Sequence, residues 1–141
     1  MKYVLDSSIG FKALVPEHLS DKADLLLQDY KNGIHELLSP EVYPIEVTHA
    51  LTRAERQNRI TPAQGSVLFT DLTNNLPKLV PSLPLLPRAY EISSQFRVGV
   101  YDCLYVALAE REKCELATAD DKLVRNLQGP FPFIKHLSTF P

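Results

Sequence analysis

The sequence predicts an α/β fold in which a mostly parallel central sheet lies between layers of helices. The alternation of two kinds of segment along the chain supports this prediction. Short apolar runs alternate along the chain with longer segments whose apolar residues recur at helical spacing, and strands that alternate with helices favour a parallel sheet. No repeat, low-complexity tract or linker divides the chain, so residues 1–141 are expected to form one domain.

The first strand is predicted immediately before Asp6, where a short apolar run ends on a carboxylate. In open parallel sheets, ligands bind at the carboxyl ends of the strands. An acid buried at that edge is costly unless it accepts hydrogen bonds or binds a cation. Asp6 is therefore a candidate site residue, and a helix-capping role is the alternative interpretation.

Two helices and a second strand are expected next. The segment 8–15 predicts a short helix that Pro16 ends. Another helix is expected from Ser20 to Asn32-Gly33, because glycine readily adopts the left-handed conformation that follows a helix. The run 34–38 then predicts the second strand.

Proline marks the helices in the middle of the chain. Ser39-Pro40 is typical of a helix start. The helix that runs to about Gln57 carries Pro44 in its first turns, so it is expected to begin at Pro44 or to kink there. Residues 61–64 (TPAQ) form a capping box that predicts a helix to about Asn74.

The second half of the chain begins with residues 76–87, which hold four prolines and predict an extended connector with a short strand near Leu79. A helix is expected to start at Pro87. The next helix, 101–112, is apolar around most of its circumference, which predicts a central position covered on most sides. The last predicted elements are a strand over 115–118, a helix over 122–128 and a strand over 133–137.

Composition limits the classes of function. A formal net charge of −2 is not the basic balance typical of nucleic-acid binders, so a polyanionic partner would have to meet a local basic patch. No apolar stretch approaches the ~20 residues of a membrane span, and the first residues lack a signal peptide's apolar region, so a cytoplasmic protein without membrane contact is expected. Cys103 and Cys114 are not in a C-x-x-C arrangement and are expected to be free thiols.

Four acids lie where apolar structure would bury them. Asp6 and Asp120 each follow a predicted strand, and both must emerge on the same edge if those strands are parallel. Glu46 and Asp102 lie in the early turns of predicted helices. Four converging carboxylates repel one another unless a divalent cation lies among them, and oxygen ligands favour Mg²⁺ or Mn²⁺ over zinc. One or two such ions suit hydrolysis of a phosphodiester.

Each acid also has an ordinary structural interpretation. Asp102 would be favoured at a helix N-terminus by the helix dipole. Glu46 would be stable on an exposed helix face, and Asp120-Asp121 on a turn. The residues alone leave both interpretations open.

Four segments carry a resemblance to a known family. They are residues 4–8 (VLDSS), 44–51 (PIEVTHAL), 100–110 (VYDCLYVALAE) and 116–123 (LATADDKL). In this order they resemble the four motifs of the PIN-domain family, and the size of the chain is similar to that of VapC-type toxins, which are metal-dependent endoribonucleases of toxin–antitoxin pairs. Cys103 departs from the small residue usual at its position.

The resemblance implies a PIN-like three-layer fold and an Mg²⁺- or Mn²⁺-dependent endoribonuclease. It implies that the metal ligands and catalytic residues are Asp6, Glu46, Asp102 and Asp120. Thr118 would be a supporting hydroxyl, and Asp121 is the less certain neighbour of Asp120. The implied partners are an RNA substrate, a cognate antitoxin protein and a second copy of the chain.

Basic residues that follow the acidic motifs are candidates for contacts with the RNA backbone. They are Lys12, Arg53, Arg56, Arg59, Lys122 and Arg125. Phosphate contacts of this kind position a strand without reading its sequence. A solvated helix face is the alternative for each of them.

Apolar positions in the segment 20–60 are candidates for a dimer interface, and a place in the core is the alternative. They are Leu25, Leu26, Leu51 and Ile60.

Two further functions compete with the ribonuclease. A phosphoacceptor receiver domain also places an aspartate at the end of a strand, but it needs an acidic pair where Asp6-Ser7-Ser8 offers one acid. A catalytically silent PIN module would act only as an RNA- or protein-binding domain. Acid-labile phosphorylation would identify the first, and absence of metal-dependent cleavage of mixed RNA would identify the second.

Overall fold

The computed structural model describes residues 1–141 and contains one five-stranded sheet with the order β3-β2-β1-β4-β5. Every neighbouring pair of strands is parallel. The strands are β1 (Lys2–Leu5), β2 (Glu36–Pro40), β3 (Lys78–Val80), β4 (Glu115–Thr118) and β5 (Ile134–His136). The predicted α/β fold with a parallel central sheet is confirmed.

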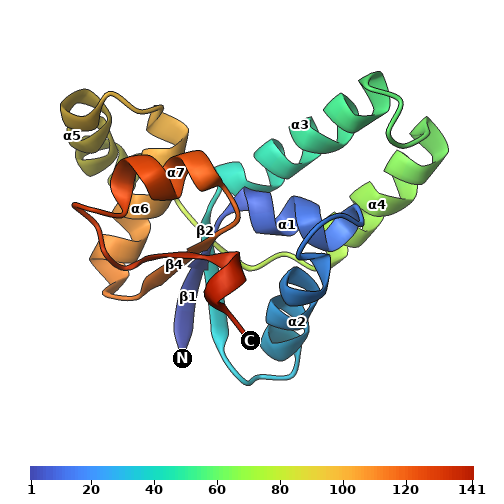
Figure 1. Cartoon of the computed structure of the whole chain (residues 1–141), viewed down its shortest axis with the longest axis horizontal. Helices are drawn as coiled ribbons and strands as arrows, with labels where there is room; N and C mark the ends of the chain where they lie inside the picture. The colour runs from blue at the N-terminus through green and yellow to red at the C-terminus, as the bar shows by residue number, and fades with distance from the viewer.

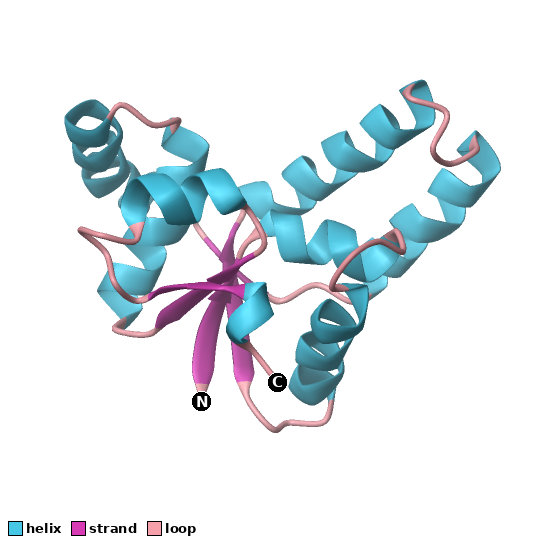
Figure 2. Ribbon diagram, viewed as in Figure 1, coloured by secondary structure: helices cyan, strands magenta, loops and turns pink.

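Seven α-helices surround the sheet. They are α1 (Ser7–Leu14), α2 (Ser20–Lys31), α3 (Val42–Arg56), α4 (Pro62–Asn74), α5 (Leu86–Phe96), α6 (Val100–Glu112) and α7 (Asp121–Leu127). In Figure 1, α5 and α6 lie on one side of the sheet and α1 and α2 on the other, while α3 and α4 project away as a pair. Figure 2 shows the strands gathered at the centre of the molecule with helices on both sides. None of the helices is long and apolar enough to cross a membrane.

Helix α6 lies at the centre of the core, as its apolar circumference predicted. All seven residues from Cys103 to Ala109 are buried. The helix packs against β1, β2 and β4 on one side and against α5 on the other. Burial of this kind is the main favourable contribution to folding, and it fixes the start of α6 beside the strand ends.

Two local predictions are wrong, both at prolines. Ser39 and Pro40 belong to β2 rather than to a helix start, and Pro40 pairs with Val80 of β3. Helix α3 begins at Val42, two residues before Pro44, and Pro44 neither starts nor needs to kink it. The first N–H groups of a helix have no partner within the helix, so a proline in the first turn removes no hydrogen bond.

The other element predictions hold to within two residues at most ends. The capping box is present, because the Thr61 hydroxyl accepts from Gln64 N–H and the Gln64 side chain accepts from Thr61 N–H. Gly33 follows α2 with a φ of +73°. The proline-rich connector contains β3, as the prediction near Leu79 required.

Two of the four residues considered for a dimer interface are core residues instead. Leu26 and Leu51 are buried, so they offer no surface to a second subunit. Leu25 is 45% exposed, and Ile60 is half-buried.

The end of β2 shows how the sheet accommodates Pro40. Glu36 N–H donates to Met1 O, and in a parallel pair such bonds recur every two residues, which brings the backbone nitrogen of residue 40 opposite Leu5 O. Pro40 has no N–H to donate. The buried Ser39 hydroxyl donates to Leu5 O instead, at 2.6 Å.

Replacement of Ser39 is expected to destabilise the protein in a way that depends on Pro40. Ser39→Ala leaves the Leu5 carbonyl without its donor and should lower the free energy of unfolding by about 1–3 kcal/mol. Pro40→Ala restores a backbone N–H at the opposite position, so Ser39→Ala should cost less in that background. Urea denaturation of the two single variants and the double variant measures the coupling. Strictly additive costs would contradict this account.

Candidate functional site

The carboxyl ends of β1 and β4 bring two of the predicted acids to the same edge of the sheet. Leu5 pairs with Ala117, and the Asp6 N–H donates to Ala117 O at 3.0 Å. Asp6 therefore continues directly from β1, and Asp120 lies two residues beyond the end of β4. The predicted convergence of these two acids on one edge is confirmed.

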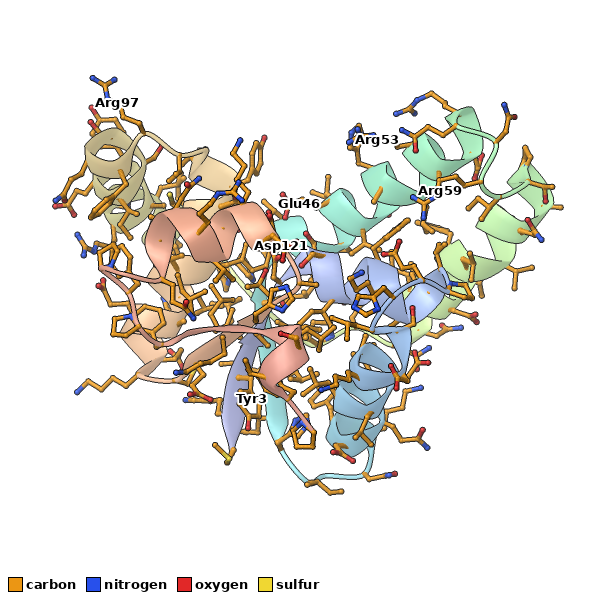
Figure 3. All side chains as sticks on the ribbon, in the orientation of Figure 1. Tyr3, Glu46, Arg53, Arg59, Arg97 and Asp121 are labelled. Carbon is orange, nitrogen blue, oxygen red and sulfur yellow. The ribbon has the colours of Figure 1, made fainter.

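The other two predicted acids reach this edge from helices. Asp102 lies in the first turn of α6 and Glu46 in the second turn of α3. All four carboxylates line one cleft with a volume of about 440 Å³, together with Ser8, Lys12 and Glu17 and other residues of α1 and α3. Figure 3 shows Glu46 near the base of α3, with Arg53 further out along the same helix.

Asp121 is not part of the cleft. Its side chain is 86% exposed and lies 2.8 Å from His136 Nε2. Asp120 lines the cleft, and its Oδ1 accepts the N–H groups of Lys122 and Leu123 at 2.9 and 3.3 Å, so it also caps α7. The turn interpretation and the site interpretation of Asp120 therefore apply to the same side chain.

Two hydroxyl groups hold the buried carboxylate of Asp6. Ser8 Oγ and Thr118 Oγ1 both donate to Asp6 Oδ2, at 2.5 and 2.8 Å. Each hydroxyl is itself oriented by the backbone, because Ser8 Oγ accepts from Ala119 N–H and Thr118 Oγ1 accepts from Asp120 N–H. The resemblance to the PIN-domain family implied a supporting hydroxyl at Thr118, and Thr118 makes such a contact, whereas Ser8 was not singled out.

Tyr105 is the other site contact that the sequence analysis missed. Its hydroxyl donates to Glu46 Oε1 at 2.7 Å, and its ring is fully buried. Tyr105 lies three residues after Asp102 in α6, so both side chains face the same side of the helix. A buried tyrosine hydroxyl needs a polar partner. A tyrosine within the apolar segment 101–112 was therefore the sign in the sequence that a polar contact would be found there.

Three of the four carboxylates use only one oxygen in these contacts. The hydrogen bonds go to Asp6 Oδ2, Glu46 Oε1 and Asp120 Oδ1, and the second oxygen of each accepts none. The neighbours thus fix the orientation of each group while leaving one oxygen free.

The cleft is electrostatically unfavourable without a cation. Burial, opposed by the hydrogen bonds from Ser8 and Thr118, raises the pKa of Asp6 from 3.8 to about 6, with Glu46 and Asp120 adding to the rise. Burial, followed by the charges of Asp6, Asp120 and Glu46, raises the pKa of Asp102 to about 7. The charge of Lys122 opposes this rise. The other acids of the cleft therefore lie close enough to Asp6 and Asp102 to disfavour the ionisation of these two groups.

This donor set suits a hard divalent cation such as Mg²⁺ or Mn²⁺, because all the candidate ligands are carboxylate oxygens. No three His, Cys, Asp or Glu side chains lie in an arrangement that would hold a metal ion as they stand. Asp6, Glu46 and Asp120 instead each direct one oxygen to a hydroxyl or N–H donor. Metal binding would therefore require one or more of the four side chains to move.

The basic candidates are distributed unequally. Lys12 lines the cleft. Arg59 donates to Glu17, which also lines it. Lys122 lies close enough to Asp102 to lower its pKa. The other three are exposed and do not line the cleft: Arg53, Arg56 and Arg125.

Replacement of Asp102 is expected to stabilise the metal-free protein at neutral pH. Because the pKa of Asp102 rises from 3.8 to about 7 on folding, the folded state binds more protons than the unfolded state between these values, and stability falls as pH rises through this window. Asp102→Asn removes that loss, so the variant should gain about 1–2 kcal/mol over the wild type at pH 8, after allowance for solvent screening, and nothing at pH 3. Chemical denaturation in EDTA measures the difference. The exposed Asp71→Asn is the control, and an equal gain in both variants would contradict the prediction.

The comparisons with known proteins agree with the fold. A chain of 28% identity over 134 residues, covering 94% of this chain and 96% of the relative, is Ribonuclease VapC3 of Pyrobaculum aerophilum. Among solved structures, PAE2754 from Pyrobaculum aerophilum has a TM-score of 0.73 at 19% identity and covers 99% of this chain and 85% of its own. VapBC2 from Rickettsia felis, bound to a DNA fragment from its promoter, has a TM-score of 0.66 at 15% identity and covers 96% and 98%.

The family comparison covers most of the chain. The model of the PIN domain family matches residues 3–126, a range that includes all four carboxylates of the cleft and the hydroxyls that orient Asp6. A match of this extent confirms the resemblance found in the four sequence motifs. The chain belongs to the PIN domain family.

Proposed function

We propose that this protein is an Mg²⁺- or Mn²⁺-dependent endoribonuclease that hydrolyses RNA phosphodiester bonds. The observation that carries the proposal is the meeting of Asp6, Glu46, Asp102 and Asp120 in one cleft at the carboxyl edge of the sheet. Membership of the PIN domain family and the likeness to Ribonuclease VapC3 support the same activity.

The four carboxylates would hold the ion, and Asp6, Glu46 and Asp120 each keep one oxygen that accepts no hydrogen bond. A divalent cation bound there supplies charge neutralisation and lowers the pKa of a coordinated water. The chain's own residues orient the ligands: Ser8 and Thr118 fix Asp6, and Tyr105 fixes Glu46. Lys12 at the same cleft would contact the phosphodiester backbone.

Water is the nucleophile in this proposal, and the RNA 2′-hydroxyl takes no part. The products would therefore carry a 5′-phosphate and a 3′-hydroxyl. None of the four histidines lines the cleft, so no imidazole is placed there to activate the 2′-hydroxyl.

We further propose that the protein is a toxin held by a cognate antitoxin, and that it forms a homodimer. The likeness to the Rickettsia felis VapBC2 structure and to a Klebsiella pneumoniae toxin–antitoxin complex, with a TM-score of 0.63, supports an antitoxin partner. An exposed apolar stripe supports the dimer. Leu83, Leu86 and Tyr90 follow one another at helical spacing from the 3₁₀ turn into α5, and they are 75%, 39% and 70% exposed.

Divalent metal is expected to stabilise the native protein. Mn²⁺ or Mg²⁺ binds the folded cleft and not the unfolded chain, so millimolar metal should raise the melting temperature by several degrees through mass action. Asp102→Asn should retain its fold but lose that increase, whereas the exposed Asp71→Asn should keep it. Differential scanning fluorimetry with and without metal measures the shift. An equal metal-dependent increase in Asp102→Asn would remove this residue from the ligand set.

End-group analysis of cleaved RNA tests the reaction itself. The wild type with Mg²⁺ or Mn²⁺ should produce 5′-phosphate and 3′-hydroxyl ends, and EDTA should abolish cleavage. Asp6→Ala and Asp120→Ala should each lower the rate by at least about 100-fold, because each removes a proposed ligand, while RNA binding persists.

Two results would contradict the proposal in different ways. Cyclic 2′,3′-phosphate ends would refute the mechanism even if every acid proved essential. RNA binding without cleavage under any metal condition would favour the alternative of a catalytically silent PIN module.

A further inference from the structure

A fifth acid of the cleft, Glu17, differs from the other four because two cations flank it. Glu17 Oε1 accepts from Lys12 Nζ at 3.3 Å, and Glu17 Oε2 accepts from Arg59 Nη2 at 3.1 Å. Each carboxylate oxygen therefore has its own basic partner. Glu17 and Lys12 both line the cleft that holds the candidate metal ligands.

The three side chains come from three different parts of the chain. Lys12 lies in the last turn of α1, Glu17 in the loop that follows it, and Arg59 in the turn after α3. Figure 3 shows Arg59 extending from the end of α3 toward α1. Arg59 thus bridges to a loop 42 residues earlier in the sequence.

Other contacts hold the two cations in place independently of Glu17. Lys12 Nζ also donates to His18 O at 2.9 Å. The guanidinium carbon of Arg59 lies 5.7 Å from the centre of the Phe11 ring, within the range of a cation–π contact. If Glu17 moved away, both cations would keep a local support at the cleft.

The two ion pairs of Glu17 are partly open to solvent. The side chain of Glu17 is 28% exposed and that of Arg59 is 44% exposed, so solvent and salt screen the attraction between them. A phosphodiester resembles the Glu17 carboxylate in offering one negative charge shared by two oxygens. Exchange of one anion for the other would leave the charge balance of Lys12 and Arg59 unchanged.

We propose that Lys12 and Arg59 form a binding subsite for an RNA phosphate next to the cleavage site, and that Glu17 occupies this subsite until RNA displaces it. This inference rests on the proposed ribonuclease function and adds to it a defined position of the strand. Glu17 is then a competitor for the substrate phosphate, and its removal should strengthen binding.

The test compares Glu17→Gln with Glu112→Gln. Glu112 is a matched control, because its side chain is also 28% exposed and also lies near two basic residues, Lys2 at 3.0 Å and Arg111 at 3.4 Å. Lys2 begins β1, so this pair lies at the opposite end of the strand from Asp6. Both variants lose one negative charge, which separates the local effect from the change in net charge.

Binding of a fluorescein-labelled single-stranded RNA is measured by anisotropy in EDTA, where cleavage does not interfere. At low salt, Glu17→Gln should bind about three- to tenfold more tightly than the wild type. Its dependence of log K on log salt concentration should steepen by about 0.7 for each additional phosphate that the variant neutralises. Glu112→Gln should bind with the affinity of the wild type.

Arg59→Ala, introduced into the wild type and into Glu17→Gln, tests whether Arg59 is the cation that becomes available to RNA when the Glu17 charge is removed. The increase in affinity from Glu17→Gln should fall to less than half when Arg59 is absent, whereas Arg53→Ala, on the exposed face of α3, should leave the increase unchanged. An increase that is equal in Glu17→Gln and Glu112→Gln, or one that survives Arg59→Ala in full, would overturn the subsite. A wild-type protein that binds no RNA in any salt, either in EDTA or with Mg²⁺ or Mn²⁺ present, would overturn the proposed function, and the subsite with it.

Discussion

The hydrogen bonds to the buried carboxylate of Asp6 are the interaction on which the rest of the site depends. Asp6 lies where β1 ends, and the two hydroxyls that hold it come from α1 and from the last residue of β4. Those hydroxyls in turn accept the N–H groups of Ala119 and Asp120, so the same contacts set the course of the chain into α7. A single buried acid thus links the ends of two central strands to the helices that follow them.

The cleft contains two groups of charged side chains, which come from different segments of the chain. Burial and the charges of the neighbouring acids raise the pKa of Asp6 and of Asp102, whereas Glu17 is neutralised by Lys12 and Arg59. A polyanion would be repelled by the first group unless a cation is bound, and would be attracted to the second group once Glu17 has moved. The proposed activity would therefore need both a metal ion and a displaced carboxylate, and the sequence alone predicted only the metal ion.

Sequence patterns predicted the parts of the fold that depend on local chemistry. Asp6 and Asp120 were identifiable because each follows an apolar run, and the parallel sheet then had to bring them together. The contact of Tyr105 with Glu46 joins residues 59 apart on two different helices, which no local pattern encodes. Ser39-Pro40 was misjudged because the same dipeptide is favourable at a helix start, and only its neighbours in the sheet show that it ends a strand.

The pairing of Ser39 with Pro40 also has a consequence for how the sequence can change over evolutionary time. While the proline is present, the hydroxyl of Ser39 is the substitute donor for the Leu5 carbonyl, so a lineage that loses the hydroxyl first passes through a weakened intermediate. A lineage that replaces the proline first regains the backbone donor, and the neighbouring position then becomes free to vary. The stability of the intermediate sequence therefore depends on which of the two residues is replaced first.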